Sequence, residues 1–362
     1  MSRFTSQHGG NRREVAQHLG VDEDTLLDFS ANINPLGMPL GVRQRLAESL
    51  GKLEQYPDVD YQSLHQALAA YHSVPPDWIQ AGNGETELIF DLVKTLDPKQ
   101  ALVVSPGFAE YQRALALVGC QVHTWWLQEN NGWQLDDGIL GALTPELDCV
   151  FLCTPNNPTG LLPDWSLLER IARRCEDNHI WLIVDEAFLD FSPQHPGFIP
   201  VLGKMPWVWV LRSMTKFYAI PGLRLGYALS SHAESMAALR AKRAPWSINT
   251  LAAIAGEQVL QETAYQQQTW QWVRTENQWL YQVLSKVPGI QAWQPQANYL
   301  FFRCDVPALD LQWALLEQAG ILIRSCANYP GLDARYYRVA VKSRAANQSL
   351  LDALHQVMSA LV

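Results

Sequence analysis

Leu211-Arg-Ser-Met-Thr-Lys216-Phe-Tyr-Ala-Ile-Pro-Gly-Leu-Arg224-Leu-Gly226 is the stretch around which the rest of the chain is organised. It follows the apolar run 207–211, which predicts a buried strand. A lysine at the end of a buried strand is costly unless it is used, because a buried amine loses its proton readily and can condense with an aldehyde. The hydroxyls of Ser213 and Thr215 and the guanidinium of Arg224 suit a phosphate monoester. The alternative for Lys216 is a loop side chain that only touches solvent.

Pyridoxal phosphate carries both an aldehyde and a phosphate, and two further segments suit it. The run 180–187 predicts a second buried strand, and its last part carries Asp185. A carboxylate there would keep the pyridine nitrogen protonated and make the ring an electron sink, although an ordinary strand-end cap is the alternative. Upstream, the turn Gly84-Glu85-Thr86 precedes an apolar helical segment, where free backbone N–H groups bind phosphate. The turn lacks the third glycine of a dinucleotide fingerprint.

The composition is that of a globular protein without a basic surface. The chain has 362 residues, 48% hydrophobic residues and a net charge of −9, so it can bury a large core, and nucleic acid or an anionic membrane is not an expected partner. It has no apolar run near the ~20 residues that span a bilayer and no signal-peptide segment, so we expect a cytoplasmic protein. We expect reduced thiols for the six cysteines. The spacing of Cys149 and Cys153 is a poor metal pattern, so no metal site is predicted.

Short apolar runs alternate with helical segments through the middle of the chain. Strands are predicted at 101–104, 121–127, 149–153, 180–187, 207–211 and 225–230. This alternation predicts an α/β fold in which a mostly parallel sheet lies between helices. Functional residues are expected just after the carboxyl ends of the strands, where open α/β sheets bind ligands.

The predicted order of helices and strands changes after residue 245. A long helical segment at 248–287 is followed by predicted strands at 298–302, 321–324 and 337–341, which indicate a smaller α+β domain. We therefore divide the chain into three parts. They are an N-terminal arm that joins the small domain (1–40), a large cofactor-binding domain (41–245) and a small C-terminal domain (246–362).

Further side chains could complete a pyridoxal site. Phe108 follows the turn at 105–107 and could stack on a flat ring, or be an ordinary core residue. Asn157 could donate a hydrogen bond to the pyridine 3-oxygen, and Tyr56 could reach a cofactor phosphate across a dimer interface. Arg324 and Arg338 lie at predicted strand ends, and arginine binds carboxylate or phosphate through a fork of donors. The alternative for each arginine is a solvated charge.

Four motifs together resemble a known superfamily. They are Pro-Asn-Asn-Pro-Thr-Gly at 155–160, Asp-Glu-Ala-Phe at 185–188, Ser-x-Thr-Lys at 213–216 and Gly-Leu-Arg-x-Gly at 222–226. The set resembles the fold-type I pyridoxal-phosphate enzymes related to histidinol-phosphate aminotransferase. More narrowly, the chain is similar from about residue 4 to its end to the threonine-phosphate decarboxylases of cobalamin biosynthesis. The narrower likeness rests on His-Gly-Gly-Asn at 8–11 and on the segments 28–37, 105–111 and 323–332.

The resemblance implies a role for each matching residue. Lys216 is the expected Schiff-base lysine, Asp185 the partner of the pyridine nitrogen and Asn157 the partner of the 3-oxygen. The cofactor phosphate is expected to contact a larger set, namely Gly84, Glu85, Thr86, Ser213 and Arg224. Arg338 is expected to bind the substrate α-carboxylate. The substrate's own phosphate is expected in a pocket formed by His8, Gly9, Asn32 and Arg324. A homodimer is also implied.

The implied reaction is decarboxylation of L-threonine O-3-phosphate to (R)-1-amino-2-propanol O-2-phosphate. One departure concerns Phe188, because many related aminotransferases have tyrosine three residues after the pyridine aspartate. The first alternative is an aminotransferase that acts on a phosphorylated amino compound such as histidinol phosphate. The second is a pyridoxal-binding regulator without activity, and the intact Lys216, Asp185 and Arg224 argue against it. The reaction type rests on the resemblance, because spacing alone does not separate decarboxylation from amino transfer.

Overall fold

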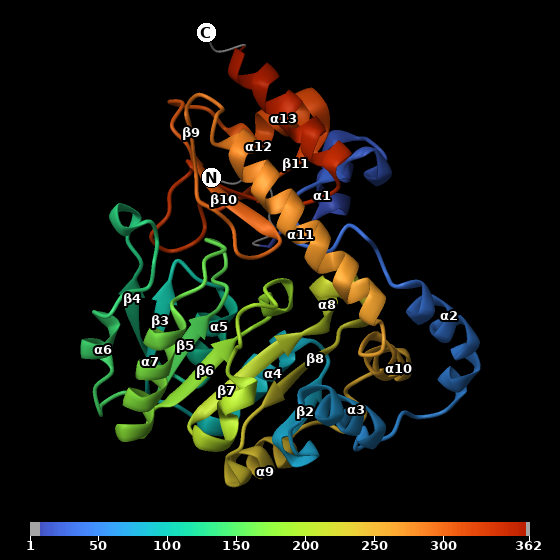
Figure 1. The fold of residues 1–362 in the computed structure, drawn as a ribbon, viewed down its shortest axis with the longest axis vertical. Coiled ribbons are helices and arrows are strands. Elements are labelled where there is room, and N and C mark those ends of the chain that lie inside the picture. Colours follow the sequence, from blue (N-terminus) through green and yellow to red (C-terminus); the bar gives the residue numbers. More distant parts are fainter. Residues whose placement is uncertain (1–7, 360–362) are drawn as a thin grey trace.

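A seven-stranded sheet forms the centre of the larger part of the molecule in the computed structural model, which describes residues 8–359 (Figure 1). The strand order is β2-β8-β7-β6-β5-β3-β4, and β8 runs antiparallel to both of its neighbours while β7, β6, β5, β3 and β4 are parallel. The strands are β2 (Ile79–Gly82), β3 (Gln100–Ser105), β4 (Gln121–Trp126), β5 (Cys149–Cys153), β6 (Trp181–Asp185), β7 (Val208–Ser213) and β8 (Gly226–Leu229). The predicted α/β fold with a mostly parallel sheet is confirmed.

Helices cover both faces of this sheet. Because side chains alternate along a strand, the neighbours Leu102 and Val103 of β3 enter different cores. The Val103 face packs against α4 (Glu85–Leu96), α5 (Glu110–Leu117) and α9 (Ala233–Lys242). The Leu102 face packs against α3 (Gln62–His72), α7 (Trp165–Asp177) and α10 (Thr250–Val259). Burial on both faces explains why the central strands are continuous apolar runs.

A smaller antiparallel sheet lies above the first, in the order β12-β13-β10-β9 (Figure 1). Its strands are β9 (Ile290–Ala292), β10 (Tyr299–Cys304), β12 (Arg324–Ser325) and β13 (Tyr336–Ala340). Leu300, Phe302 and Val339 bury one side of this sheet against α12 (Leu311–Ala319) and α13 (Arg344–Ser359). The long helix α11 (Thr263–Leu284) runs from beside α10 to this sheet. The division into domains at residues 40 and 245 stays a prediction.

Two predicted elements are interrupted. The helical segment 248–287 is two helices, α10 and α11, and the strand expected at 321–324 is split into β11 (Ile321–Leu322) and β12. The split arises because β11 pairs in parallel with β1 (Leu27–Asp28), whereas Arg324 and Ser325 pair with β13. Within residues 8–359, no helix combines the length and the apolarity needed to cross a membrane. The six cysteines are free thiols.

The remaining elements are short. The helices are α1 (Arg12–Leu19), α2 (Leu40–Glu48), α6 (Ile139–Ala142) and α8 (Met214–Phe217). The 3-10 helices are η1 (Glu23–Thr25), η2 (Leu50–Glu54), η3 (Pro76–Trp78), η4 (Glu129–Asn131), η5 (Leu189–Phe191), η6 (Ile199–Lys204) and η7 (Pro221–Leu223).

Candidate active site at the carboxyl ends of the parallel strands

Lys216 is held in the single turn of α8, immediately after β7 ends at Ser213. Its side chain is 25% exposed, and its ammonium donates a hydrogen bond to Ser213 Oγ at 2.9 Å. The same nitrogen lies 3.3 Å from Glu85 Oε2 and 5.3 Å from the centre of the Phe188 ring. The lysine is therefore engaged with buried groups at a strand end and is not a loop side chain that only touches solvent.

Asp185 ends β6, the strand next to β7, and is 4% exposed. Its Oδ1 accepts a hydrogen bond from the backbone N–H of Ala187 at 2.9 Å, and its Oδ2 accepts one from the Tyr111 hydroxyl. Burial, reinforced by the charge of Asp185, raises the pKa of Tyr111 well above its usual value. Tyr111 is therefore a stable donor that fixes the orientation of this carboxylate.

The glycine turn packs closely against the segment that carries Arg224. Gly84 has φ +82°, and a Cβ added there would lie 2.7 Å from an Arg224 side-chain nitrogen. At Gly226, a Cβ would lie 2.5 Å from the backbone nitrogen of Glu85, so the start of β8 requires glycine to approach the N-terminus of α4. Thr86 lies in the first turn of this helix. The turn thus combines free helix N–H groups with a guanidinium, which is the donor set that phosphate prefers.

Two hydroxyls lie beside this turn at the end of β7. Ser213 Oγ and Thr215 Oγ1 are 2.8 Å apart and both side chains are buried. Arg224 itself is exposed, with a backbone in the left-handed region (φ +58°), and donates a hydrogen bond to the Pro221 carbonyl at 3.0 Å. A non-glycine residue rarely adopts this conformation, so the local structure holds Arg224 against the turn at a cost in backbone strain.

The side chain of Glu85 is a feature that the sequence did not predict. Its carboxyl is buried, and Oε1 has no hydrogen-bond partner among residues 8–359. Burial raises the pKa of Glu85 well above its usual value, the charge of Asp185 raises it further, and Lys216 opposes the shift. The carboxyl is therefore within electrostatic reach of both predicted catalytic residues. With these two residues, the phosphate donors and this unsatisfied buried oxygen, the residues present fit pyridoxal phosphate.

Phe108 and Asn157 border the same region. The Phe108 ring is partly buried and meets Tyr111 edge-on, with centroids 5.7 Å apart. Asn157 is 9% exposed, and its Oδ1 accepts hydrogen bonds from Arg338 at 2.5 Å and from the Tyr329 hydroxyl at 3.2 Å. The amide oxygen of Asn157 therefore faces the small sheet, which leaves its nitrogen as the group that can donate toward a cofactor oxygen.

Arg324 and Arg338 face each other across the ladder between β12 and β13, and both are buried, with 9% and 6% exposure. Neither is a solvated charge. Arg338 also donates to the Ser30 carbonyl at 2.9 Å, and its Nε is buried without a hydrogen-bond partner within the described chain. Arg324 donates to Asn328 Oδ1 at 2.8 Å. Two cations are thus held side by side at the edge of the candidate site.

The N-terminal segment passes close to these groups. His8 Nε2 lies 3.0 Å from Glu110 Oε1, and the His8 ring lies 5.9 Å from Phe108. A Cβ at Gly9 would come within 2.1 Å of the Ser30 carbonyl oxygen, so only glycine permits this approach. Asn32 is 5% exposed, and its side-chain oxygen has no partner in the described part of the chain.

Tyr56 is separate from this cluster. It is 82% exposed, and its ring packs on Trp246 at a centroid distance of 4.9 Å.

The sequence did not predict two tyrosines of the site, Tyr111 and Tyr329, which orient Asp185 and Asn157. The available signal for Tyr111 was an aromatic hydroxyl in the first turn of a helix that follows a strand end.

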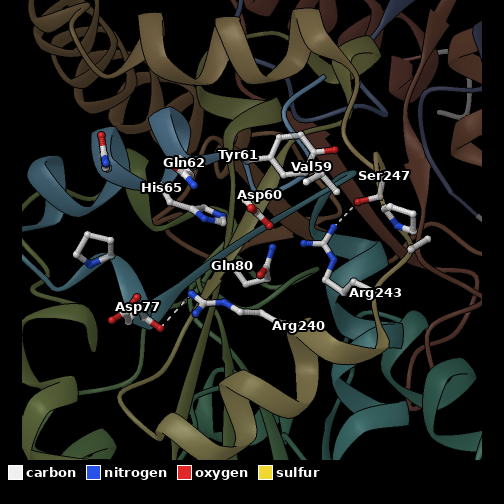
Figure 2. Close-up of a pocket in the computed structure, with 14 residues that line it drawn as sticks. Val59, Asp60, Tyr61, Gln62, His65, Asp77, Gln80, Arg240, Arg243 and Ser247 are labelled. Carbon is white, nitrogen blue, oxygen red and sulfur yellow. Dashed lines mark hydrogen bonds between the residues drawn. The ribbon is translucent and has the colours of Figure 1, made fainter. Parts of the chain in front are cut away.

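A pocket of about 450 Å³ lies elsewhere, between α3 and the segment after α9 (Figure 2). Arg240 and Arg243 reach it, but their hydrogen bonds go to carbonyls, carboxylates and Ser247 within the chain. Arg243 donates to the Ala81 carbonyl and to Glu87, directly behind the glycine turn. We interpret this pocket as structural support for the turn.

The groups expected to bind the cofactor lie at the carboxyl ends of β6 and β7 and at the N-terminus of α4. Comparisons with known proteins support the same kind of site. The model of the aminotransferase class I and II family matches residues 24–354. The chain belongs to this family. Within the family it falls among the threonine-phosphate decarboxylases. It is 58% identical to threonine-phosphate decarboxylase of Salmonella typhimurium over 361 residues, which cover 100% of this chain and 99% of that protein.

Solved structures show the same architecture. The histidinol-phosphate aminotransferase of Clostridium acetobutylicum superposes with a TM-score of 0.87 at 31% identity, over 92% of this chain and 100% of that one. The L-threonine-O-3-phosphate decarboxylase of Porphyromonas gingivalis superposes with a TM-score of 0.82 at 25% identity, over 91% and 99% of the two chains. The fold-type I architecture is therefore shared by proteins of two different activities.

Proposed function

We propose that the chain is a pyridoxal-phosphate-dependent lyase that converts L-threonine O-3-phosphate into (R)-1-amino-2-propanol O-2-phosphate and carbon dioxide for cobalamin biosynthesis. The facing pair Arg324 and Arg338 carries the proposal. Like charges directly opposite each other in a sheet are destabilising. A substrate with a carboxylate at one end and a phosphate at the other would neutralise both. The 58% identity with threonine-phosphate decarboxylase supports this choice.

Pyridoxal 5'-phosphate would be held from three sides. Lys216 would bind its aldehyde carbon, Asp185 its ring nitrogen, and the turn at 84–86, with Ser213, Thr215 and Arg224, its phosphate. When bound, this cofactor supplies an electron sink for the bond broken at the substrate Cα. Asp185 would hold a proton on the ring nitrogen, and the Tyr111 hydroxyl keeps that carboxylate in place. Phe108 would cover the ring.

The substrate would be held by its two anionic ends. Arg338 would bind the α-carboxylate, and Arg324, His8, Gly9 and Asn32 would bind the phosphate. A substrate fixed at both ends could not rotate about its Cα–N bond, so Arg338 and Arg324 would orient its carboxylate as the group that leaves. Such orientation is worth roughly 7–11 kcal/mol in favourable intramolecular reactions. In an aminotransferase the Cα–H bond is oriented to break instead.

The decisive test measures both reactions of the cofactor-loaded protein with O-phosphothreonine. Carbon dioxide should be released, and the cofactor should remain in its aldehyde form. If the protein instead converts its cofactor to pyridoxamine phosphate and releases no carbon dioxide, it is an aminotransferase and the proposal fails. Histidinol phosphate, tested in parallel with a keto acid, gives the comparison for that activity.

We further propose that the chain works as a cytoplasmic homodimer. Large apolar side chains are exposed on and after α2, namely Leu40, Leu50, Leu53, Tyr56 and Val59. The exposed Trp246, which follows α9, packs on Tyr56. A second copy that covers this surface would bring its own Tyr56 toward the cofactor phosphate of its partner. Light scattering should give twice the mass of 40.8 kDa, and a monomer with full activity would contradict the assignment of Tyr56.

A further inference from the structure

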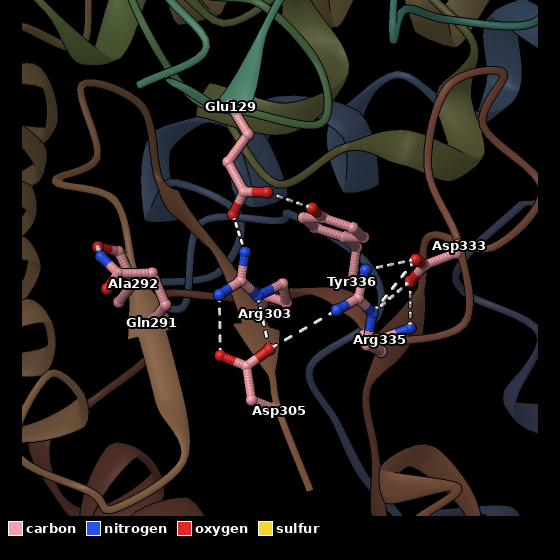
Figure 3. A network of polar contacts seen from close by, with 8 residues as sticks. All are labelled: Glu129, Gln291, Ala292, Arg303, Asp305, Asp333, Arg335 and Tyr336. Atoms are coloured by element: carbon pink, nitrogen blue, oxygen red, sulfur yellow. Dashed lines mark hydrogen bonds and ion pairs between the residues drawn. The ribbon is translucent and has the colours of Figure 1, made fainter. Parts of the chain in front are cut away.

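A short segment after β4 connects the edge of the large sheet with the small sheet. Glu129, at the start of η4, accepts a hydrogen bond from Tyr336 at 2.8 Å through Oε2 and one from Arg303 through Oε1 (Figure 3). Arg303 belongs to β10 and Tyr336 to β13, and the two residues are paired across that ladder. Arg303 is also bound by Asp305 through two hydrogen bonds, of 2.6 and 2.8 Å. One carboxylate of the large part thus holds two strands of the small sheet.

The same segment supplies an aromatic contact. Trp133 is 5% exposed and meets Tyr336 edge-on at 5.6 Å and Phe301 edge-on at 5.9 Å. Further along the chain, a Cβ at Gly331 would lie 2.9 Å from the ring of Trp126. We call the set Glu129, Trp133, Arg303 and Tyr336 the clasp. It combines a charge-assisted hydrogen bond with buried aromatic packing, both of which resist sliding of the small sheet.

The backbone of the clasp is strained. Trp133 has φ +64°, which is unusual for a bulky residue and strains the backbone. The turn is closed by hydrogen bonds of 2.8 Å from Gly132 N–H to the Glu129 carbonyl and from Trp133 N–H to the Gln128 carbonyl. Backbone strain persists only where the surrounding structure over-determines the conformation. The turn therefore presents Glu129 and Trp133 together and in fixed positions.

The clasp lies next to the substrate-binding arginines. Tyr336 precedes Arg338 by two residues in β13, so both side chains are on the same face of the strand. Phe301, which Trp133 contacts, is the direct partner of Arg338 in the ladder with β10. A shift of β13 relative to the large sheet would move Arg338 away from Asn157 and from Lys216, which are anchored in the large part.

We propose that Glu129 is a positioning residue for the decarboxylation, an inference that rests on the function proposed above. It does not touch the substrate. It acts through Tyr336 and Arg303, and it fixes β13 so that the Arg338 guanidinium holds the substrate carboxylate perpendicular to the cofactor ring. Loss of Glu129 leaves the cofactor residues in place and loosens the substrate-binding strand alone.

Glu129→Ala tests this role, with Asp137→Ala as the matched control. Asp137 forms a two-fold hydrogen-bonded ion pair with Arg170 on the surface of the large part, without reaching the small sheet. Glu129→Ala should lower kcat/KM for O-phosphothreonine about tenfold, because misplacement of a substrate-binding group by a change far from the chemistry lowers activity. Cofactor affinity should change less than twofold. Glu129→Gln, which keeps an acceptor for Arg303, should recover most of the activity.

A double-variant cycle and hydrogen exchange complete the test. In a Tyr336→Phe background, Glu129→Ala should have a smaller effect, because one of the two contacts through which Glu129 acts is already lost. Amide exchange in β13 should be faster in Glu129→Ala than in Asp137→Ala, a readout that does not depend on the reaction. The inference is wrong if β13 exchanges equally in both variants, or if Glu129→Ala loses cofactor affinity together with activity. Absence of carbon dioxide release by the wild type would instead overturn the proposed function.

Discussion

Replacing Arg324 by alanine should separate substrate binding from control of the reaction. Arg324 is 9% exposed and lies across from Arg338 in the small sheet. The phosphate of the substrate carries a charge of about −1.5 to −2 near neutral pH, and a chain with net charge −9 repels it except where cations are held locally. The variant therefore removes one of the two buried cations that favour a dianionic ligand.

The expected magnitude follows from the hydrogen bonds that the guanidinium of Arg324 would donate to the substrate phosphate. Hydrogen bonds to charged groups contribute about 1.5–3 kcal/mol, and each 1.4 kcal/mol is a factor of ten, so KM for O-phosphothreonine should rise about 10- to 100-fold. Loss of Arg324 also relieves its repulsion of Arg338, which should help the variant to remain folded. Arg170→Ala is the control, since it changes the net charge equally while removing an exposed arginine paired with Asp137 on the surface of the large part.

Single-turnover spectra with O-phosphothreonine also report the reaction type. Without its phosphate anchor, the substrate can rotate about Cα–N, and the Cα–H bond then visits the position perpendicular to the ring. Carbon dioxide release should fall steeply, and the ratio of pyridoxamine phosphate formed to carbon dioxide released should rise. A KM within twofold of Arg170→Ala would refute the phosphate pocket. A constant ratio, with both rates falling together, would mean that Arg324 supplies binding only and that Arg338 and Asn157 control orientation.

Five further variants have expected outcomes. Wild-type protein should show a near-visible absorbance band that borohydride bleaches, and Lys216→Ala should lack it, bind cofactor weakly and lose turnover. Asp185→Asn should lose most activity because a neutral pyridine is a poor electron sink, and Tyr111→Phe should lower kcat by roughly tenfold, as expected for one hydrogen bond to a charged group. His8→Ala should raise KM for O-phosphothreonine without changing cofactor affinity, and an unchanged KM would exclude His8 from the pocket. Burial raises the pKa of Glu85 in the folded protein, so the folded state binds more protons than the unfolded state between the ordinary glutamate pKa and this raised pKa. Cofactor-free protein should therefore lose stability as the pH rises through that range. Thermal unfolding of Glu85→Gln should show a weaker pH dependence.

The sequence predicts the strand-end residues well because apolar runs report buried strands directly. Parallel strands meet at one edge of the sheet, so the ends of the runs that carry Asp185 and Ser213 had to lie together. Lys216 and the glycine turn are also predictable, because each is recognised from its neighbours in the sequence, a buried strand before the lysine and a helix after the turn. The contact between Tyr111 and Asp185 spans 74 residues and depends on how α5 rotates over the sheet, which no local pattern reports.

The small sheet was harder to predict in detail. The arginines were found as candidates, but their direct opposition depends on the register between β12 and β13, and two-residue strands carry too little pattern to fix a register. The use of the Asn157 side-chain oxygen by Arg338 was missed for the same reason. Tyr56 remains a prediction, because a role across a dimer interface depends on a second chain.

Reaction type must be decided outside the large sheet. A histidinol-phosphate aminotransferase and a threonine-phosphate decarboxylase share this fold with TM-scores of 0.87 and 0.82, so the architecture that holds Lys216 and Asp185 is compatible with both reactions. The two reactions differ in which bond at Cα stands perpendicular to the ring, and that is set by where the anionic ends of the substrate are bound. Here the cations that would bind them lie on β12 and β13, and Glu129 links β13 to the large sheet through Tyr336. We therefore expect the choice between loss of carbon dioxide and loss of a proton to depend on the position of this small sheet. A shift that takes a guanidinium out of reach of its anion would change which bond at Cα breaks.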